Sequence, residues 1–439
     1  MANPRHIALD ILCRVEAGAY ADRLLASYRQ KTDLTPRDHN FLQQIVRGTL
    51  TWQGTIDHTL KPYLKKPLAK QAPRLRNLLR LSAYQIRYLD RTPPYAVVSE
   101  AVSLAKKEFR GLSGLVNAVL RGLAENRKPV RPFDPRSNPV EHLSLTLSHP
   151  PWLVSRWIDR YGPKSAQELC HYNNTPPPLS IRPNTLRSPL KNLQNCLLAE
   201  GIPTEPCPLL PDYLMAPKAG PLFQTQAFQN GLFSIQNPAA GLVIRLLDPQ
   251  PGQQILDLCS APGGKTTAIA EGFDDSGLIL ATDLYPGRLW TLLNHCRRLG
   301  LTSIYPVAAN GNALPTSARF HRVLVDAPCS SLGILNHHPE IRWRRQESDL
   351  AHLARRQSHL LQSAAQYVCP DGLLVYSTCT LEPEENERVV ETFLKNHTEF
   401  RLEPASEYLD LVCDGPYLSI LPHQHHLDGT FAARLRKAT

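Results

Sequence analysis

An apolar run leads directly into a glycine-containing turn at Ile255-Leu256-Asp257-Leu258-Cys259-Ser260-Ala261-Pro262-Gly263-Gly264-Lys265-Thr266-Thr267. This order predicts a strand, a tight turn and a helix. A phosphate-binding P-loop is excluded, because that motif requires glycine at the position that Cys259 occupies. The dinucleotide pattern G-x-G-x-x-G is also absent, since the two glycines are adjacent. The turn is either an ordinary strand-to-helix connection or one that lets a ligand approach the backbone closely.

Around this turn, short apolar runs alternate with helical patterns over residues 231–439. Candidate strands lie at 254–258, 278–282, 322–325 and 373–376, and a helix is expected over 349–368. Such alternation predicts an α/β Rossmann-like domain with a mostly parallel sheet and helices on both faces. Ligands bind these sheets at the carboxyl ends of the strands, so the residues that follow each strand form the candidate site.

Three of these strand ends carry distinctive side chains. Asp283 follows the second strand, where a carboxylate can accept hydrogen bonds from both ribose hydroxyls. Cys329 follows the third strand in Asp-Ala-Pro-Cys (326–329), and Cys379 follows the fourth in Ser-Thr-Cys (377–379). If these two strands are neighbours, the thiols meet above the sheet edge. Either cysteine alone is more often a buried thiol, and Asp283 alone a solvated carboxylate; together with the turn they favour nucleoside binding beside a reactive cysteine pair.

The front of the chain is helical and basic. Residues 1–130 hold 22 Lys and Arg against 10 Asp and Glu, so the positive excess of the whole chain, +10, lies there. Helices are expected near 72–89, 95–108 and 113–125, and Thr35 is placed to cap another. A concentrated basic bundle favours a polyanionic partner, usually nucleic acid, although an inert basic surface has the same composition.

Between these parts the sequence predicts a linker and a smaller unit. Residues 129–151 are rich in Pro and Asn, a helix is expected over 152–170, a strand over 179–182 and a helix over 189–200. The predicted domains are an all-α bundle over 1–130, a linker and helix over 131–165, a small α+β subdomain over 166–230 and the Rossmann-like domain over 231–439.

Several classes of protein are disfavoured by composition. No apolar run reaches the length of a membrane span, and the N-terminus leads into an amphipathic pattern rather than a secretion signal. The ten cysteines include no Cys-x-x-Cys pair, and the histidines at 423, 425 and 426 lack a complete ligand set, so no metal site is expected. We expect a cytoplasmic monomer.

The paired cysteine motifs resemble those of the RNA cytosine-5 methyltransferase family. Residues 261–266 (Ala-Pro-Gly-Gly-Lys-Thr) are similar to the loop that holds the methionine-derived cofactor in that family. Residues 34–57 and 94–102 resemble the NusB-like RNA-binding domain at the front of one bacterial branch, the ribosomal RNA small-subunit methyltransferases B, and 428–431 resemble its terminal strand. The resemblance covers essentially the whole chain. It implies methylation of carbon 5 of a cytosine in 16S rRNA, either free or in an assembling subunit.

The resemblance also assigns roles to single residues. It makes Cys379 the nucleophile that attacks the cytosine ring, and Cys329 the group that helps to release the RNA; the reverse assignment is the alternative, because DNA cytosine methyltransferases use a Pro-Cys thiol. Asp326 would stabilise the activated base near nitrogen 3, and Lys265 would either assist or serve structure alone. The implied cofactor, S-adenosylmethionine, would be bound by Leu258, Cys259, Ser260, Ala261, Pro262, Gly263, Gly264, Lys265, Asp283, Asn312 and Asp326.

Four features depart from the family pattern or stay open. Asn312 stands where the family often has an adenine-contacting Asp, and Asn237 where Gln-Asp is common. Residues 182–184 are either an RNA-facing stretch or a strand edge. Residues 342–345 (Arg-Trp-Arg-Arg) either grip RNA or form an exposed loop. The rival functions are a non-catalytic RNA-binding regulator of the NusB type and a methyltransferase acting on transfer RNA or on another ribosomal cytosine.

Overall fold

The computed structural model describes residues 3–126, 133–217, 222–409 and 413–439. The chain divides into two compact units. Unit 1 comprises Met1–Pro176 and Leu335–Arg345, and unit 2 comprises Pro177–Ile334 and Gln346–Thr439. Within the described ranges, no helix combines the length and apolarity that a membrane span requires.

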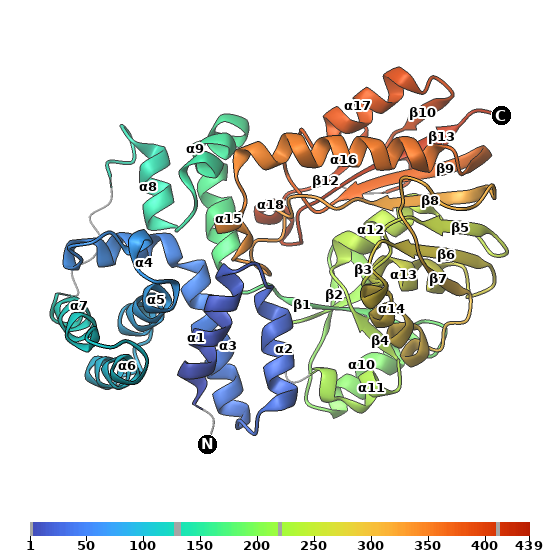
Figure 1. Cartoon of the computed structure of the whole chain (residues 1–439). Coiled ribbons are helices and arrows are strands. Elements are labelled where there is room, and N and C mark those ends of the chain that lie inside the picture. Colours follow the sequence, from blue (N-terminus) through green and yellow to red (C-terminus); the bar gives the residue numbers. More distant parts are fainter. Residues whose placement is uncertain (1–2, 127–132, 218–221, 410–412) are drawn as a thin grey trace. The chain divides into compact units, whose positions relative to one another are not determined.

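Unit 1 is a bundle of helices (Figure 1), in which α1 to α7 pack around one apolar core. The expected cap is present: the hydroxyl of Thr35 accepts a hydrogen bond from the Asp38 amide at 3.2 Å and starts α3. Helices α5, α6 and α7 confirm the three that periodicity predicted. The front helices are α1 (Pro4–Glu16), α2 (Ala21–Lys31), α3 (Pro36–Thr51), α4 (Gln53–Leu60), α5 (Pro73–Tyr88), α6 (Pro94–Glu108) and α7 (Ser113–Glu125).

The expected linker over 129–151 is partly wrong. Residues 127–132, which include the predicted boundary at 130, lie outside the described residues, but α8 (Pro139–Thr146) occupies the second half of the linker. Its Leu143 and Leu145 are buried, and the Leu145 carbonyl accepts a hydrogen bond from Thr55 of α4 at 2.7 Å. Tertiary burial of two leucines therefore outweighs a composition rich in Pro and Asn. The following helix, α9 (Pro151–Asn174), is longer than expected and bends at Gly162.

The segment 335–345 is distant in sequence but belongs to unit 1, where it forms α15 (Ile341–Arg344). Arg342 is fully buried and donates hydrogen bonds to Asn174 Oδ1 at 2.7 Å and to the Ser148 carbonyl at 3.2 Å. The indole of Trp343 donates to the Leu50 carbonyl at 2.7 Å. Both interpretations of residues 342–345, an RNA grip and an exposed loop, are therefore wrong for Arg342 and Trp343. These two side chains donate hydrogen bonds to other residues inside unit 1.

Unit 2 begins with a small antiparallel sheet in the order β2-β3-β1-β4, which confirms the expected α+β piece. Its last strand lies beyond the predicted limit at residue 230. The elements are β1 (Leu179–Pro183), α10 (Leu190–Ala199), β2 (Glu205–Cys207), β3 (Leu210–Ala216), α11 (Gln226–Gln229) and β4 (Phe233–Ile235).

The main sheet of unit 2 has the order β11-β12-β13-β9-β8-β5-β6-β7, with β10 beside β13. Strands β5 to β9 pair in parallel, and the C-terminal strands add antiparallel. This confirms the mostly parallel sheet that alternation predicted. The strands are β5 (Gln254–Asp257), β6 (Leu278–Asp283), β7 (Ile304–Ala308), β8 (Phe320–Asp326), β9 (Val368–Thr378), β10 (Phe400–Glu403), β11 (Cys413–Asp414), β12 (Tyr417–Ile420) and β13 (Thr430–Lys437).

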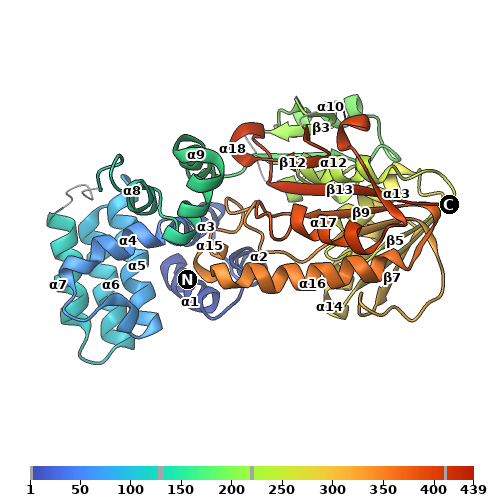
Figure 2. The same cartoon turned by 90° about the horizontal axis from the view of Figure 1, so that it is seen from above.

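Helices cover both faces of this sheet (Figures 1 and 2). Alternate strand residues point to opposite sides: Ile255 packs with α12, α13 and α14, whereas Leu256 packs with α16 and α17. The helix expected over 349–368 ends earlier, because Val368 already belongs to β9. The helices are α12 (Pro238–Leu247), α13 (Gly264–Gly272), α14 (Pro286–Leu299), α16 (Glu347–Ala365), α17 (Glu387–Asn396) and α18 (Pro422–His425).

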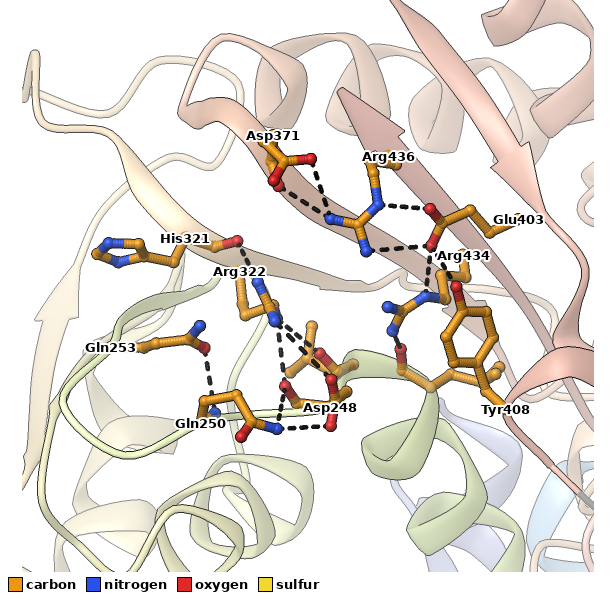
Figure 3. A network of polar contacts seen from close by, with 12 residues as sticks. Asp248, Gln250, Gln253, His321, Arg322, Asp371, Glu403, Tyr408, Arg434 and Arg436 are labelled. Carbon is orange, nitrogen blue, oxygen red and sulfur yellow. Dashed lines mark hydrogen bonds and ion pairs between the residues drawn. The ribbon is translucent and has the colours of Figure 1, made fainter. Parts of the chain in front are cut away.

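A charged network closes the amino-end edge of the sheet (Figure 3). Glu403 accepts hydrogen bonds from Arg434 at 2.8 Å and from the Tyr408 hydroxyl at 3.0 Å, and it also pairs with Arg436. Burial opposes ionisation of Glu403, but the hydrogen bonds from Arg436 and Arg434 lower its pKa to about 2. The network therefore joins β10 to β13. It lies at the end of the sheet opposite to the carboxyl ends of the parallel strands.

Candidate functional site

The carboxyl ends of four adjacent parallel strands meet at one edge of the sheet in unit 2. In the order β9-β8-β5-β6 they end near Cys379, Asp326, Asp257 and Asp283. Strands β8 and β9 are therefore neighbours, which was the condition for the two cysteines to meet.

The turn after β5 is held by backbone contacts and by one glycine conformation. The amide and hydroxyl of Ser260 both donate to the Thr282 carbonyl of β6, at 2.8 and 3.0 Å. Gly263 has φ +106°, and a Cβ there would lie 2.4 Å from Leu292 Cδ1, so only glycine fits. Helix α13 then starts at Gly264 and directs backbone N–H groups, without helical partners, towards the edge.

Asp257 lies behind this turn and was not among the expected site residues. It is 1% exposed, and its Oδ2 accepts a hydrogen bond from the Thr266 hydroxyl at 2.7 Å. Burial raises the pKa of this carboxyl to about 7. Asp257 therefore supports the turn from inside, as a group that is partly protonated near neutral pH.

Asp283 ends β6 with both carboxylate oxygens engaged. Oδ1 accepts from the Tyr285 amide at 2.9 Å, and Oδ2 lies 3.1 Å from the Arg288 guanidinium. Arg288 also donates to the Ala261 carbonyl at 2.5 Å, so it joins the carboxylate to the turn. No sequence pattern marks Arg288, because an arginine in the first turn of an amphipathic helix is indistinguishable from an ordinary surface charge.

The two cysteines are in contact: their sulfur atoms are 3.3 Å apart, and the Cys379 amide donates to the Cys329 sulfur at 3.4 Å. The hydrogen bond from Cys329 lowers the pKa of the Cys379 thiol, and the same hydrogen bond, with burial, raises the pKa of Cys329 well above its usual value. The pair therefore favours a Cys379 thiolate beside a protonated Cys329. A thiolate is the nucleophilic form of cysteine.

Lys265 and Asp326 form an ion pair beside the thiols, with Nζ 2.8 Å from Oδ1. The Ser377 hydroxyl donates to the same Asp326 oxygen at 2.9 Å. Burial of Lys265 opposes its charge, but the neighbouring Asp326 carboxylate outweighs burial and raises the lysine pKa. The lysine thus remains an ammonium ion, and its charge contributes to lowering the pKa of Cys379.

The loops that carry the cysteines are tied together by buried hydrogen bonds. The Ser330 and Thr380 hydroxyls, each next to one of the cysteines, are 2.7 Å apart. Glu385 accepts from the Ser330 amide and from the Gln357 side chain, both at 2.8 Å. These contacts fix the positions of the two cysteine loops relative to each other. Sequence reasoning did not identify Glu385, although it follows the Ser-Thr-Cys motif closely.

Arg182 is a buried structural residue, not an RNA contact. Its guanidinium pairs with Glu271 at 2.9 Å and donates to the Gly264 carbonyl and to Gln236, both at 2.7 Å. It therefore braces the start of α13 from the small sheet. Asn237, the second departure from the family pattern, caps α12 by accepting from the Ala239 amide at 3.0 Å.

Among the described residues, no hydrogen bond or ion pair joins Asn312 to the other expected site residues. It is exposed in the turn after β7, and its amide donates to Asn310 Oδ1 at 3.1 Å. Cys259 lies in the turn, where burial raises its thiol pKa; it therefore differs from Cys379 in being held as a neutral thiol.

Comparisons with known proteins agree with this architecture. Residues 244–436 match the model of the 16S rRNA methyltransferase RsmB/F family, residues 2–125 match the NusB family, and residues 149–222 match an RsmF/B-like ferredoxin-like domain. The chain is 36% identical to the probable ribosomal RNA small subunit methyltransferase B of Bacillus subtilis (strain 168), over 99% of this chain and 98% of that one. The chain belongs to the RsmB/F family of 16S rRNA methyltransferases.

Other RsmB/F relatives extend over similar lengths. A probable ribosomal RNA small subunit methyltransferase B from Synechocystis sp. is 36% identical with full coverage of both chains, and the enzyme from Yersinia pseudotuberculosis is 32% identical over 92% of each. Among solved structures, PH0851 superposes with a TM-score of 0.86 at 26% identity, over 100% of this chain and 99% of that one. A methyltransferase homologue from Pyrococcus horikoshii gives 0.61 at 26% identity, over 70% and 100%.

Family membership confirms the methyltransferase assignment, the NusB-like front domain and S-adenosylmethionine as methyl donor. It excludes the purely non-catalytic regulator as an account of the whole chain. The sheet edge fits this donor chemically. Each carboxylate oxygen of Asp283 has one contact within the protein and could accept a second hydrogen bond from a ribose hydroxyl, and the amino end of α13 could donate backbone N–H groups to a carboxylate.

Proposed function

We propose that the protein methylates carbon 5 of a cytosine in 16S rRNA through a covalent bond between Cys379 and that cytosine. The observation that carries the proposal is the asymmetric cysteine pair: two sulfur atoms 3.3 Å apart, of which the Cys379 thiol has the lowered pKa and the Cys329 thiol the raised one. Carbon 5 of cytosine is a weak nucleophile, and covalent catalysis is the established physical route around such a barrier.

In the proposed cycle carbon 5 gains one methyl group and loses one proton, and Cys379 begins and ends as a thiolate. The Cys379 thiolate adds to carbon 6, and the electron pair of the carbon 5–carbon 6 double bond becomes available at carbon 5. Bound S-adenosylmethionine supplies the electrophilic methyl group that carbon 5 takes up. A base then removes the proton from carbon 5, the double bond re-forms, and the carbon 6–sulfur bond breaks to return the Cys379 thiolate.

The neighbouring side chains have roles that follow from their charge. Addition of the thiolate places negative charge on the pyrimidine ring, and the Lys265–Asp326 pair supplies a positive charge and a hydrogen-bonding carboxyl next to the sulfur atoms. Cys329 is in contact with the attacking sulfur, and this contact supports a role for Cys329 in release of the RNA. The target base must leave its helical stack to reach this edge.

The reverse assignment, with Cys329 as nucleophile, is disfavoured by its raised thiol pKa, because a protonated thiol is a poor nucleophile. It nevertheless makes a distinct prediction. If Cys329 attacks, Cys329→Ala abolishes methyl transfer and Cys379→Ala leaves an adduct.

The experiment is incubation of the protein with radiolabelled S-adenosylmethionine and unmodified 16S rRNA, both as free transcript and as assembling subunits, followed by mapping of the labelled base. We expect label on carbon 5 of one cytosine. Cys379→Ala should abolish transfer, whereas Cys196→Ala, which removes an exposed thiol, should not. Label on another atom or another base, or full activity of Cys379→Ala, contradicts the proposal.

A further inference from the structure

A hollow of about 470 Å³ lies within unit 1, beside the C-terminal half of α3. One wall is aromatic. Trp52 and Tyr84 line it, and Tyr88 stacks on both, with ring centroids 5.0 Å from Trp52 and 5.4 Å from Tyr84. A Cβ on Gly48 would lie 2.0 Å from the Tyr84 ring, so glycine at this position allows the ring to lie against α3. The volume is typical of small-ligand sites, ~300–1,000 Å³.

A second wall of the hollow is formed by carboxamides on one face of α3. Asn40, Gln43, Gln44 and Arg47 follow helical spacing and all line the hollow. The first three side chains are exposed, and within the described part of the chain their amides have no protein hydrogen-bond partner. A carboxamide presents a donor and an acceptor side by side.

Asn336, from the segment 335–345 that belongs to this unit, also lines the hollow. Asn336 is 7% exposed, and its Nδ2 is buried without a hydrogen-bond partner among the described residues. Arg47 fixes this segment by donating to the His337 carbonyl. Asn174 also lines the hollow, but its amide is used by the Leu147 carbonyl and by Arg342. An unpaired buried donor at a polar hollow is costly unless a ligand or water meets it.

We propose that this hollow binds one unpaired nucleobase of the RNA, at a point other than the methylated cytosine. The proposal rests on the proposed function, which makes RNA the substrate. Nucleobase edges carry adjacent donors and acceptors that Asn and Gln match, and their faces stack on aromatic rings. The front domain supplies the basic surface that attracts the backbone. No cysteine lines the hollow, so the base held there is a recognition base.

The test compares RNA strands that differ only in their bases. The full-length protein is titrated with fluorescent ten-residue strands of adenosine, cytidine or uridine, and with an abasic ribose-phosphate strand of equal length. The variants are the double substitution Gln43→Ala with Gln44→Ala, on the exposed face of α3, and Trp52→Ala. Gln30→Ala, on the exposed face of α2, is the matched control, and Trp52→Phe tests whether an aromatic ring suffices.

We expect at least one homopolymer to bind wild-type protein about five- to hundredfold more tightly than the abasic strand. The double variant and Trp52→Ala should lose that difference, while Gln30→Ala and Trp52→Phe keep it. The slope of log affinity against log salt should stay unchanged in all variants, because phosphate contacts are untouched. With unmodified 16S rRNA, the KM for RNA should rise and kcat should stay constant.

Two results overturn the proposal. In the first, the double variant keeps the wild-type preference for strands that carry bases. In the second, it loses affinity for the abasic strand equally and with a smaller salt slope, which would make the hollow a backbone site. Failure of the proposed function is a separate result, since the binding titration requires neither cofactor nor methyl transfer: wild-type protein would then discriminate bases without labelling any cytosine.

Discussion

The Cys379 sulfur lies 3.3 Å from the Cys329 sulfur, and this contact is the main cause of the lowered pKa of Cys379. We predict that Cys379 is alkylated by iodoacetamide with a midpoint below pH 9 and that Cys329→Ala raises this midpoint by about one to two pH units, the value of one hydrogen bond to a charged group. Mass spectrometry of the modified peptides against pH measures both. The Ser331 hydroxyl also lies 3.5 Å from the Cys379 sulfur and lowers the pKa of that thiol. An unchanged midpoint in Cys329→Ala would show that Lys265 and Ser331 set the reactivity without Cys329.

The same pair predicts opposite consequences of two substitutions in the presence of RNA. Cys329→Ala should form a covalent complex with 16S rRNA that survives denaturing electrophoresis, because adduct formation needs Cys379 while release needs Cys329. Cys379→Ala should form none. The double variant Cys329→Ala with Cys379→Ala is the control for nonspecific crosslinking. An adduct in the double variant would show that Cys379 is not the residue that bonds to the RNA.

Arg288 contacts both the Asp283 carboxylate and the Ala261 carbonyl of the turn. We therefore predict that substitutions of Asp283 and Arg288 weaken cofactor binding to different extents. Asp283→Ala should weaken binding of S-adenosylmethionine by roughly 10- to 100-fold, as expected for lost hydrogen bonds to a charged group. Arg288→Met should weaken it less, because it only frees the carboxylate and the Ala261 carbonyl. Isothermal calorimetry measures both affinities.

Arg245→Ala is the matched control for this series, since its pair with Asp212 is exposed on both sides. The control should bind S-adenosylmethionine like the wild type. Equal affinity in wild type and Asp283→Ala would contradict the ribose assignment.

Much of this site could be predicted because each motif follows a strand. The continuous apolar run at Ile255-Leu256 is typical of a strand buried on both faces, and parallel order then brings Asp283, Cys329 and Cys379 to one edge. The sequence alone did not determine which strands are neighbours. The structure shows that β8 pairs with β9, and this pairing brings the two cysteines together.

Two arginines whose roles the sequence analysis misinterpreted make contacts with residues that are distant in sequence. Arg182 reaches Glu271 across 89 positions, and Arg342 reaches Asn173 across 169. No local period marks such contacts, so an arginine in the sequence suggests a surface or an RNA contact even where it is fully buried. The adenine contact of Asn312 stays a prediction, because Asn312 is exposed in a turn, where the backbone and not the residue type decides the direction of the side chain.

Asp257 gives a pH dependence of stability whose sign differs from that of most carboxylates. Burial raises its folded pKa to about 7, above the ordinary value of 3.8, so between these values the folded state holds a proton that the unfolded state has lost. Its contribution to the free energy of unfolding therefore falls as pH rises from about 4 to 7. Asp257→Asn removes this term, and the difference in Tm between variant and wild type should become more positive from pH 5 to pH 8.

Asp275→Asn is the control with the opposite sign. Burial opposes ionisation of Asp275, but hydrogen bonds from Ser303 and Thr302 lower its pKa below 3.8, so its stabilisation is complete above that value and is lost only as pH falls through the folded pKa. The Tm difference between Asp275→Asn and wild type should therefore be constant from pH 5 to 8. Differential scanning calorimetry across this range separates the two, and a flat difference for Asp257→Asn would mean that its carboxyl is ionised throughout.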